Sequence, residues 1–135
     1  MVRFAFLNYR ALSMSNTLAI DETFYRQTSS ERYDQVLQLI KKSQSIWALA
    51  DAEGCLIIDL GTDKVLPIWP TEALASGWGE KDHEGFKGLE INATDWLEKW
   101  LPGMQNDKFS VGVAPNLAGE CIVSSAEEHA ADLQK

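Results

Sequence analysis

The sequence VLPIWPTEALASGW, at residues 65–78, begins like a β-strand, ends like a short helix and carries prolines on both sides of Trp69. Pro67 has no amide N–H to donate to a neighbouring strand, so this run is predicted to be an edge strand or to contain a bulge. Pro70 ends the strand and holds the preceding tryptophan in an extended conformation. Thr71 can then cap the helix that follows. The stretch predicts a switch from strand to helix, with the tryptophan anchored at the corner.

Two further strand-like runs precede this corner, SIWALA at 45–50 and CLIIDL at 55–60. The connectors DAEG and GTDK are short and rich in aspartate and glycine, which is typical of antiparallel hairpins. Together with VLPIW at 65–69, the runs predict a three-stranded antiparallel meander. The side of the third strand that Pro67 faces should be an open edge, or should be covered by the loop after Trp78.

The segment before the strands, TSSERYDQVLQLIKKS at 28–43, has the pattern of an amphipathic helix. Thr28 and Glu31 have the spacing of a capping box, in which each side chain accepts a hydrogen bond from the other residue's amide. Apolar residues then recur at the spacing of one helix face. The residues of this predicted buried stripe are Tyr33, Val36, Leu37 and Ile40.

A further helix is predicted in NATDWLEKWLPGM, residues 92–104. Asp95 and Lys99 are four residues apart, so they can form an ion pair on its surface. Pro102 and Gly103 are expected to end the helix, because a proline cannot continue the hydrogen-bond pattern. Its predicted buried face is made of Trp96, Leu97, Trp100 and Leu101.

The remaining elements complete an α+β pattern. A short strand is possible at 89–91, two strands are predicted at 108–114 and 120–125, and a capped helix at 126–135 ends the sequence. The fold expected from this order is a single α+β domain over residues 21–135. It has a mixed, mostly antiparallel sheet of about five to six strands, with about four helices packed on it.

Composition narrows the possible partners. The chain has 135 residues, five of them tryptophan, and a formal net charge of −8. Such an acidic protein repels phosphate backbones, so we expect no nucleic-acid partner. The apolar run near the N-terminus is too short for a membrane span, and we expect no membrane partner. Residues 1–20 are predicted to be disordered or a non-native extension outside the domain, with Met14 as an alternative start.

Five segments together resemble a bacterial family catalogued as domain of unknown function 2750: ERYDQVL, IWALAD, VLPIWPTEALASGW, WLEKWLPGM and VGVAPN. The resemblance covers about residues 28–133 and is strongest at LPIWP with the following helix, and at LEKWLP. It implies no activity, cofactor or catalytic residue. A weaker likeness is to the amino-terminal domain of the enhanced-serine-sensitivity family, which shares a strand ending in a leucine–proline pair before a helix.

The residues that could hold a metal or act in catalysis form no known motif. Cys55 and Cys121 lie in strand-like runs and are interpreted as reduced core thiols. His83 lies among the acidic residues of the 80–84 loop, but their spacing matches no metal-binding loop. We therefore expect no metal and no cofactor, and catalytic residues are not assigned. His129 is interpreted as a surface histidine with acidic neighbours.

The leading hypothesis is a cytoplasmic bacterial binding or interaction module whose partner is a protein or a small molecule. An enzyme is the rival, a small hydrolase or transferase that uses the 80–84 loop; an acidic antitoxin-like inhibitor is a third possibility. Trp47, Trp96 and Trp100 are expected in the core, whereas Trp69 and Trp78 can be either core residues or contacts. The residues of the possible partner surface are Trp69, Trp78, Glu80, Asp82, His83 and Glu84.

Overall fold

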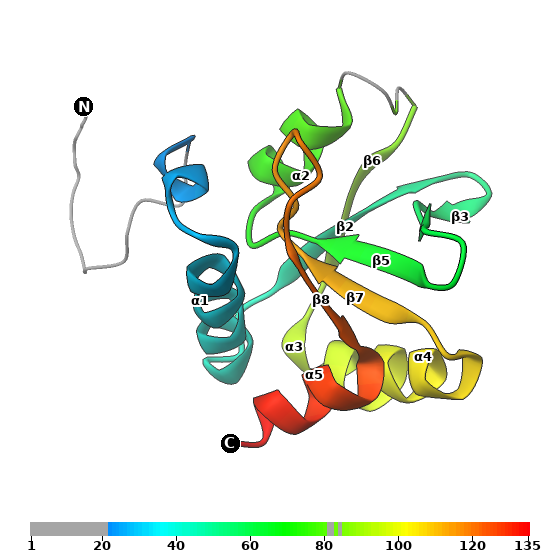
Figure 1. Cartoon of the computed structure of the whole chain (residues 1–135). Coiled ribbons are helices and arrows are strands. Elements are labelled where there is room, and N and C mark those ends of the chain that lie inside the picture. The colour runs from blue at the N-terminus through cyan, green and yellow to red at the C-terminus, as the bar shows by residue number, and fades with distance from the viewer. Residues whose placement is uncertain (1–21, 81–82, 84) are drawn as a thin grey trace.

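The computed structural model describes residues 22–80, 83 and 85–135, which form one α+β domain as predicted. The prediction for residues 1–20 lies outside the described part of the chain. Two small sheets form the centre, one of three strands and one of four (Figure 1). The strands are β2 (Ile46–Asp51), β3 (Gly54–Cys55), β4 (Ile58–Asp59), β5 (Lys64–Ile68), β6 (Lys87–Ile91), β7 (Ser110–Val113) and β8 (Ile122–Ser125).

The helices pack around these sheets. Helix α1 lies against β7, β8 and α5, while α2 packs against β2 and β6 (Figure 1). The short helix α4 packs against α5 below the strands. The helices are η1 (Glu22–Arg26), a 3₁₀ turn, α1 (Ser29–Lys41), α2 (Glu72–Gly79), α3 (Ala93–Asp95), η2 (Trp96–Trp100), a π-helix, α4 (Leu101–Asp107) and α5 (Ala126–Leu133).

Most strand pairs are antiparallel, as the sequence predicts. The first sheet has the order β3-β2-β6 and the second has the order β4-β5-β7-β8. Only the β5–β7 pair is parallel among the described strands. The two sheets meet where Trp47 of the first pairs with Trp69, just after β5 of the second. Each of these tryptophans donates its backbone N–H to the other's carbonyl oxygen at 2.8 Å.

Pro67 lies at an interruption on one side of β5. Backbone groups of a strand point alternately to its two sides, and Trp69 points toward β2, so Pro67 points the same way. On that side β4 pairs with β5 only at Lys64 and Val65, and β2 only at Trp69. The backbone nitrogen of Pro67 therefore faces the gap between β4 and β2, where no strand needs an N–H donor. This gap explains why a proline is tolerated in β5, and it agrees with the prediction of a weakly paired side.

The predicted three-stranded meander differs from the structure in its middle strand. The run at 55–60 is divided: β3 pairs with β2 in the first sheet, and β4 pairs with β5 in the second. Each piece has only two residues. The chain turns between them because β3 is antiparallel to β2 and β4 is antiparallel to β5, while β2 and β5 are antiparallel to each other where Trp47 pairs with Trp69. A hairpin pattern alone cannot show that its two connections belong to different sheets.

The helix predicted to end at Pro102 and Gly103 continues through both residues to Asp107. A π-helical turn, η2, precedes the proline, and the amide of Leu101 donates to the carbonyl of Trp96 five residues earlier. Proline is tolerated at the first turn of α4, where its missing N–H is not needed. The wider turn also changes which side chains are buried. Leu97, predicted on the buried face, is 42% exposed.

One charged side chain lies inside the core. Arg32 of α1 is 2% exposed, and its guanidinium donates to the carbonyl oxygens of Ala114 at 3.1 Å, Glu120 at 2.7 Å and Gln27 at 2.8 Å. A fourth bond goes to the Ser29 hydroxyl at 3.2 Å. Several bonds to a charged donor offset part of the cost of burying it. Arg32 thereby joins α1 to the turn between β7 and β8.

Candidate functional site

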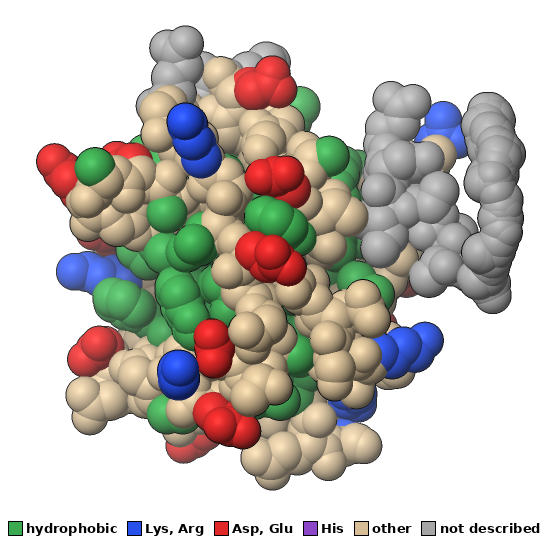
Figure 2. Space-filling view, turned by 180° about the vertical axis from the view of Figure 1, so that it is seen from behind, with side chains coloured by type: hydrophobic (Ala, Val, Ile, Leu, Met, Phe, Trp, Pro, Cys, Tyr) green, Lys and Arg blue, Asp and Glu red, His purple; other side chains and the backbone are tan. Residues whose placement is uncertain are grey.

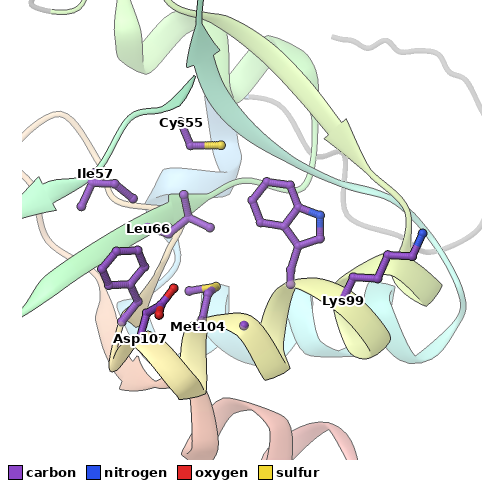
Figure 3. A pocket seen from close by; sticks show the side chains of 9 residues that line it. Cys55, Ile57, Leu66, Lys99, Met104 and Asp107 are labelled. Atoms are coloured by element: carbon purple, nitrogen blue, oxygen red, sulfur yellow. The ribbon is translucent and has the colours of Figure 1, made fainter. Parts of the chain in front are cut away.

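An apolar groove of about 470 Å³ opens between the divided edge of the sheets and the helix pair η2–α4 (Figure 3). Its volume falls within the range of about 300–1,000 Å³ that is usual for binding pockets. The bend between β3 and β4 contributes to one wall, and the helices contribute the opposite wall. The lining residues are Cys55, Ile57, Leu66, Lys99, Trp100, Gly103, Met104, Asp107 and Phe109.

The helical wall follows from one periodic pattern. Trp100, Gly103, Met104 and Asp107 are spaced at i, i+3, i+4 and i+7, so they share the face turned toward the sheet. Gly103 has no side chain and leaves room between its neighbours. A Cβ atom built on it would meet no atom within 4 Å apart from its chain neighbours and the backbone of its own helix. The groove therefore exists partly because glycine occupies this position.

The sheet wall comes from the bend between the two sheets. Cys55 and Ile57 are two residues apart and both line the groove, and Leu66 of β5 lies beside them (Figure 3). Phe109, after the end of α4, also lines the groove. In the space-filling view from behind, apolar side chains gather at the left centre, with charged side chains around them (Figure 2). The groove is thus an open apolar surface and not an enclosed cavity.

Polar chemistry in the groove is limited. Burial raises the pKa of the Cys55 thiol, so it is held in its protonated, weakly nucleophilic form at neutral pH. Lys99 and Asp107 are exposed. Lys99 also forms the predicted surface ion pair with Asp95, at 3.4 Å between Nζ and Oδ1. The arrangement suits an apolar group that enters between these charges.

Replacing Gly103 with alanine is expected to stabilise the protein by about 0.5–1 kcal/mol, because alanine restricts the unfolded chain and favours the helix. The empty space around Gly103 accommodates the methyl group. Gly112→Ala should do the opposite, since its Cβ would come within 2.8 Å of Val65 Cγ1. Urea unfolding of both variants at neutral pH measures the difference. A destabilised Gly103→Ala protein would mean that the groove is filled by atoms of the chain itself.

The structure brings together three of the residues in the predicted partner surface, but in different environments. Trp69 is completely buried, so its side chain belongs to the core and offers no surface to a partner. Trp78 is half-buried and donates its indole N–H to the carbonyl of Asn116 at 2.7 Å. The ring of His83 stacks on Trp78, with 5.1 Å between ring centroids and 8° between planes. The ring of Trp78 also packs against the ring of Trp69, with 5.2 Å between their centroids.

The structure describes one of the other residues of that predicted partner surface. Glu80 is exposed at the end of α2, whereas Asp82 and Glu84 lie outside the described residues. Within the residues that the structure describes, no group of three or more histidine, cysteine and carboxylate side chains could hold a metal ion. A partner surface around Trp78 and the 80–84 loop stays a prediction.

The interpretation of His129 as a surface residue is wrong. Its side chain is fully buried, where the indole N–H of Trp96 donates to Nε2 at 3.0 Å. An indole can only donate, so Nε2 carries no proton and the neutral ring has its proton on Nδ1. Nδ1–H then donates to the Tyr33 oxygen at 3.3 Å, and the Tyr33 hydroxyl donates to Asp132 at 2.6 Å. This chain of bonds joins η2, α5 and α1.

The fold and the groove define a small single-domain α+β protein with an open apolar groove on its surface. The chain belongs to the family described as Protein of unknown function (DUF2750), which it matches over residues 33–133. No curated protein matches it. The match confirms the first resemblance found in the sequence. In the described part of the chain, none of the helices has the length and apolar character needed to cross a membrane.

Proposed function

We propose that this protein is a binding module that accepts a large apolar or aromatic side chain of a partner protein in the groove between the sheet bend and α4. The observation that carries the proposal is the groove itself, with Trp100, Met104 and Phe109 as its aromatic and flexible apolar surfaces. Aromatic side chains and methionine are enriched where proteins bind each other. The partner's side chain would bury apolar area that is now exposed to water.

A protein side chain fits this surface better than a free small molecule. Pockets for small molecules surround most of the ligand and orient it with several polar groups. Here the groove is open, and the charged groups of its lining are the exposed Lys99 and Asp107. General acid–base or nucleophilic catalysis would need a suitably tuned group inside, and the Cys55 thiol is held protonated. These features favour binding over a reaction.

The proposal also places the protein in the cytoplasm. Cys55 and Cys121 are both free and half-buried. Unpaired thiols of this kind persist in a reducing compartment, whereas an oxidising one favours disulfides. Burial raises the pKa of both thiols, which further lowers their reactivity. Bacterial origin, which rests on the resemblance in the sequence, is consistent with this setting.

The test begins with selection of random peptides displayed on phage against the full chain. Gly103→Leu should fill the groove from its helical wall, because the space around Gly103 is empty. Gly77→Leu is the matched control: the same change in helix α2, also into open space and outside the groove lining. The selected peptides should bind the wild type and Gly77→Leu equally, and Gly103→Leu at least about tenfold more weakly, the effect of losing roughly 1.4 kcal/mol.

Two results would overturn the proposal. One is that selection yields no peptide that binds the folded wild-type chain. The other is that selected peptides bind Gly103→Leu as tightly as the wild type. Circular dichroism and urea unfolding of each leucine variant establish that loss of binding is not loss of fold.

A further inference from the structure

We propose that the free edge of β6 binds an extended, basic segment of a partner protein as an added β-strand. β6 is the outermost strand of the first sheet, which has the order β3-β2-β6. All five of its residues, Lys87–Ile91, pair with β2 in one uninterrupted register. An exposed edge of this kind can pair with another extended chain. None of the groove-lining residues belongs to β6, so this surface is additional to the one in the proposed function.

The pairing of β2 shows which backbone groups of β6 are free. Trp47 exchanges both of its backbone hydrogen bonds with Trp69, and the carbonyl of Leu49 also accepts a bond on the side of β2 away from β6. Their opposite residues in β6 are Glu90 and Gly88, so these are non-hydrogen-bonded pairs whose backbone groups point away from each other. The N–H and C=O groups of Gly88 and Glu90 therefore face outward. They make no hydrogen bond to another described residue.

A free carboxylate lies beside this open edge. Glu90 is exposed, and Gly88 is partly exposed. A Cβ atom built on Gly88 would come within 2.9 Å of Cγ and 3.3 Å of Oε2 of Glu72, at the start of α2. The side chain of Glu72 thus occupies the space that a larger residue in β6 would fill. Among the described residues, neither glutamate side chain has an ion-pair or hydrogen-bond partner.

These two carboxylates indicate which residue an added strand should carry. On an antiparallel added strand, the residue directly opposite Gly88 would direct its side chain to the face where Glu72 lies. Glu90 is the next residue of β6 on the same face. Diagonal neighbours across two strands are within reach of long side chains. A lysine or arginine opposite Gly88 can therefore approach both carboxylates, and the net charge of −8 attracts a basic segment.

The same carboxylates disfavour pairing between two copies of the chain. In an antiparallel pair of β6 strands, outward-facing residues must stand opposite outward-facing residues. Gly88 opposite Glu90 of a second copy would bring that glutamate onto Glu72. Gly88 opposite its own counterpart would bring two copies of Glu72 together, and Glu90 opposite its counterpart would do the same for Glu90. Like charges in these positions are destabilising, so every register favours a separate basic partner.

The experiment selects random peptides displayed on phage against Gly103→Leu, whose groove is filled, and measures their affinity for variants of the full chain by fluorescence anisotropy. Glu90→Pro removes an outward-facing N–H and keeps the bonds to β2, which a proline at a strand edge allows. Glu90→Gln removes the charge alone. The selected peptides should share a lysine or arginine in an extended apolar run. They should bind Glu90→Pro at least about tenfold more weakly than Glu90→Gln, because strand pairing is lost.

The charge contribution is tested separately. Glu72→Gln and Glu90→Gln should each weaken binding about threefold, the size of an exposed ion pair. Glu53→Gln is the matched control, because Glu53 is exposed in the turn between β2 and β3, away from the β6 edge, and its replacement should leave the affinity unchanged. Urea unfolding of each variant establishes that a loss of binding is not a loss of fold.

Two results would overturn strand addition at β6: a selection that yields no peptide, or peptides that bind Glu90→Pro as tightly as Glu90→Gln. Neither affects the groove proposal, which is judged by Gly103→Leu against the wild type. Two others would replace the partner with a different occupant. A wild-type dimer that the peptide dissociates, detected by sedimentation, would assign the edge to a second copy. At least about tenfold tighter peptide binding after removal of residues 1–20 would assign it to the chain's own N-terminal segment.

Discussion

Replacing Trp69 with alanine is expected to lower the free energy of unfolding by about 3–5 kcal/mol, the range for truncating a buried aromatic side chain. Trp69 has no exposed surface and lies where the two sheets meet. Its ring packs against Trp78, and its indole N–H donates to the carbonyl of Pro115 at 3.4 Å. The substitution keeps the backbone bonds to Trp47 but leaves a cavity at the joint. Urea unfolding at neutral pH measures the loss.

Two variants show whether the loss comes from this packing. Trp69→Phe keeps an aromatic ring and removes the long hydrogen bond, so its cost should be clearly smaller. Leu97→Ala changes a large apolar residue that is 42% exposed and should stay within about 0.5 kcal/mol of the wild type. If Trp69→Ala were as mild as Leu97→Ala, the joint would not depend on this side chain.

Local features of the fold could be predicted because they depend on neighbours in the sequence. The capping box at Thr28 is present as expected, and the predicted cap of the last helix is a second capping box, at Ser125. The Thr71 hydroxyl accepts the amide of Leu74 at 3.1 Å. The pair Asp95–Lys99 is formed as well. Each of these features needs only residue types three or four positions apart. The strand-to-helix switch after Trp69 is also local, and it too is confirmed.

Features that depend on distant partners could not be predicted in this way. The run CLIIDL reads as one strand because nothing in its own residues shows that its halves pair with different sheets. The groove arises at that division and needs α4 opposite it. Pro102 indicates that the helix geometry is irregular at this point. It does not show that a π-turn lets the helix continue past the proline, because that turn depends on packing against distant residues.

The burial of His129 has a signal in the sequence. Ala126, His129, Ala130 and Leu133 are spaced as one helix face, so the histidine is part of the stripe that packs inward. Its acidic neighbours in the sequence lie on other faces of α5 and say little about its surroundings. A histidine on an apolar stripe should find hydrogen-bond partners in the core, and Trp96 and Tyr33 are those partners.

Lowering the pH from 7 to about 4 is expected to cost roughly 3 kcal/mol of stability through His129 alone. Burial lowers its pKa from 6.5 to about 4, although the nearby Asp132 carboxylate acts in the opposite direction. In the unfolded chain the imidazole of His129 is therefore protonated below pH 6.5, whereas in the folded chain it stays neutral down to about pH 4. A difference of about 2.5 pKa values, at 1.36 kcal/mol each, gives this figure. Stability is therefore complete above pH 6.5 and falls through this window.

The other groups of the network change stability in other pH ranges. The Tyr33 hydroxyl and Lys135 lower the pKa of Asp132 from 3.8, so its contribution is lost only at lower pH. Burial and Asp132 raise the pKa of Tyr33 from 10.0 to about 12. The unfolded chain therefore loses this proton first, and stability falls above about pH 10. The interval between pH 6.5 and 4 reports mainly on His129 within this network.

Urea unfolding at pH 7 and at pH 4.2 for the wild type and two variants tests the assignment. His129→Gln keeps an acceptor for the Trp96 indole but cannot take a proton, so it should be less stable at pH 7 yet lose much less between the two conditions. His83→Gln removes the chain's other histidine without touching the buried network and should keep the wild-type loss. An equal fall in His129→Gln and the wild type would assign the acid sensitivity to carboxylates. We do not expect this result, because a proton on Nε2 of His129 breaks the hydrogen bond from the Trp96 indole N–H. A protonated Nε2 can no longer accept that bond.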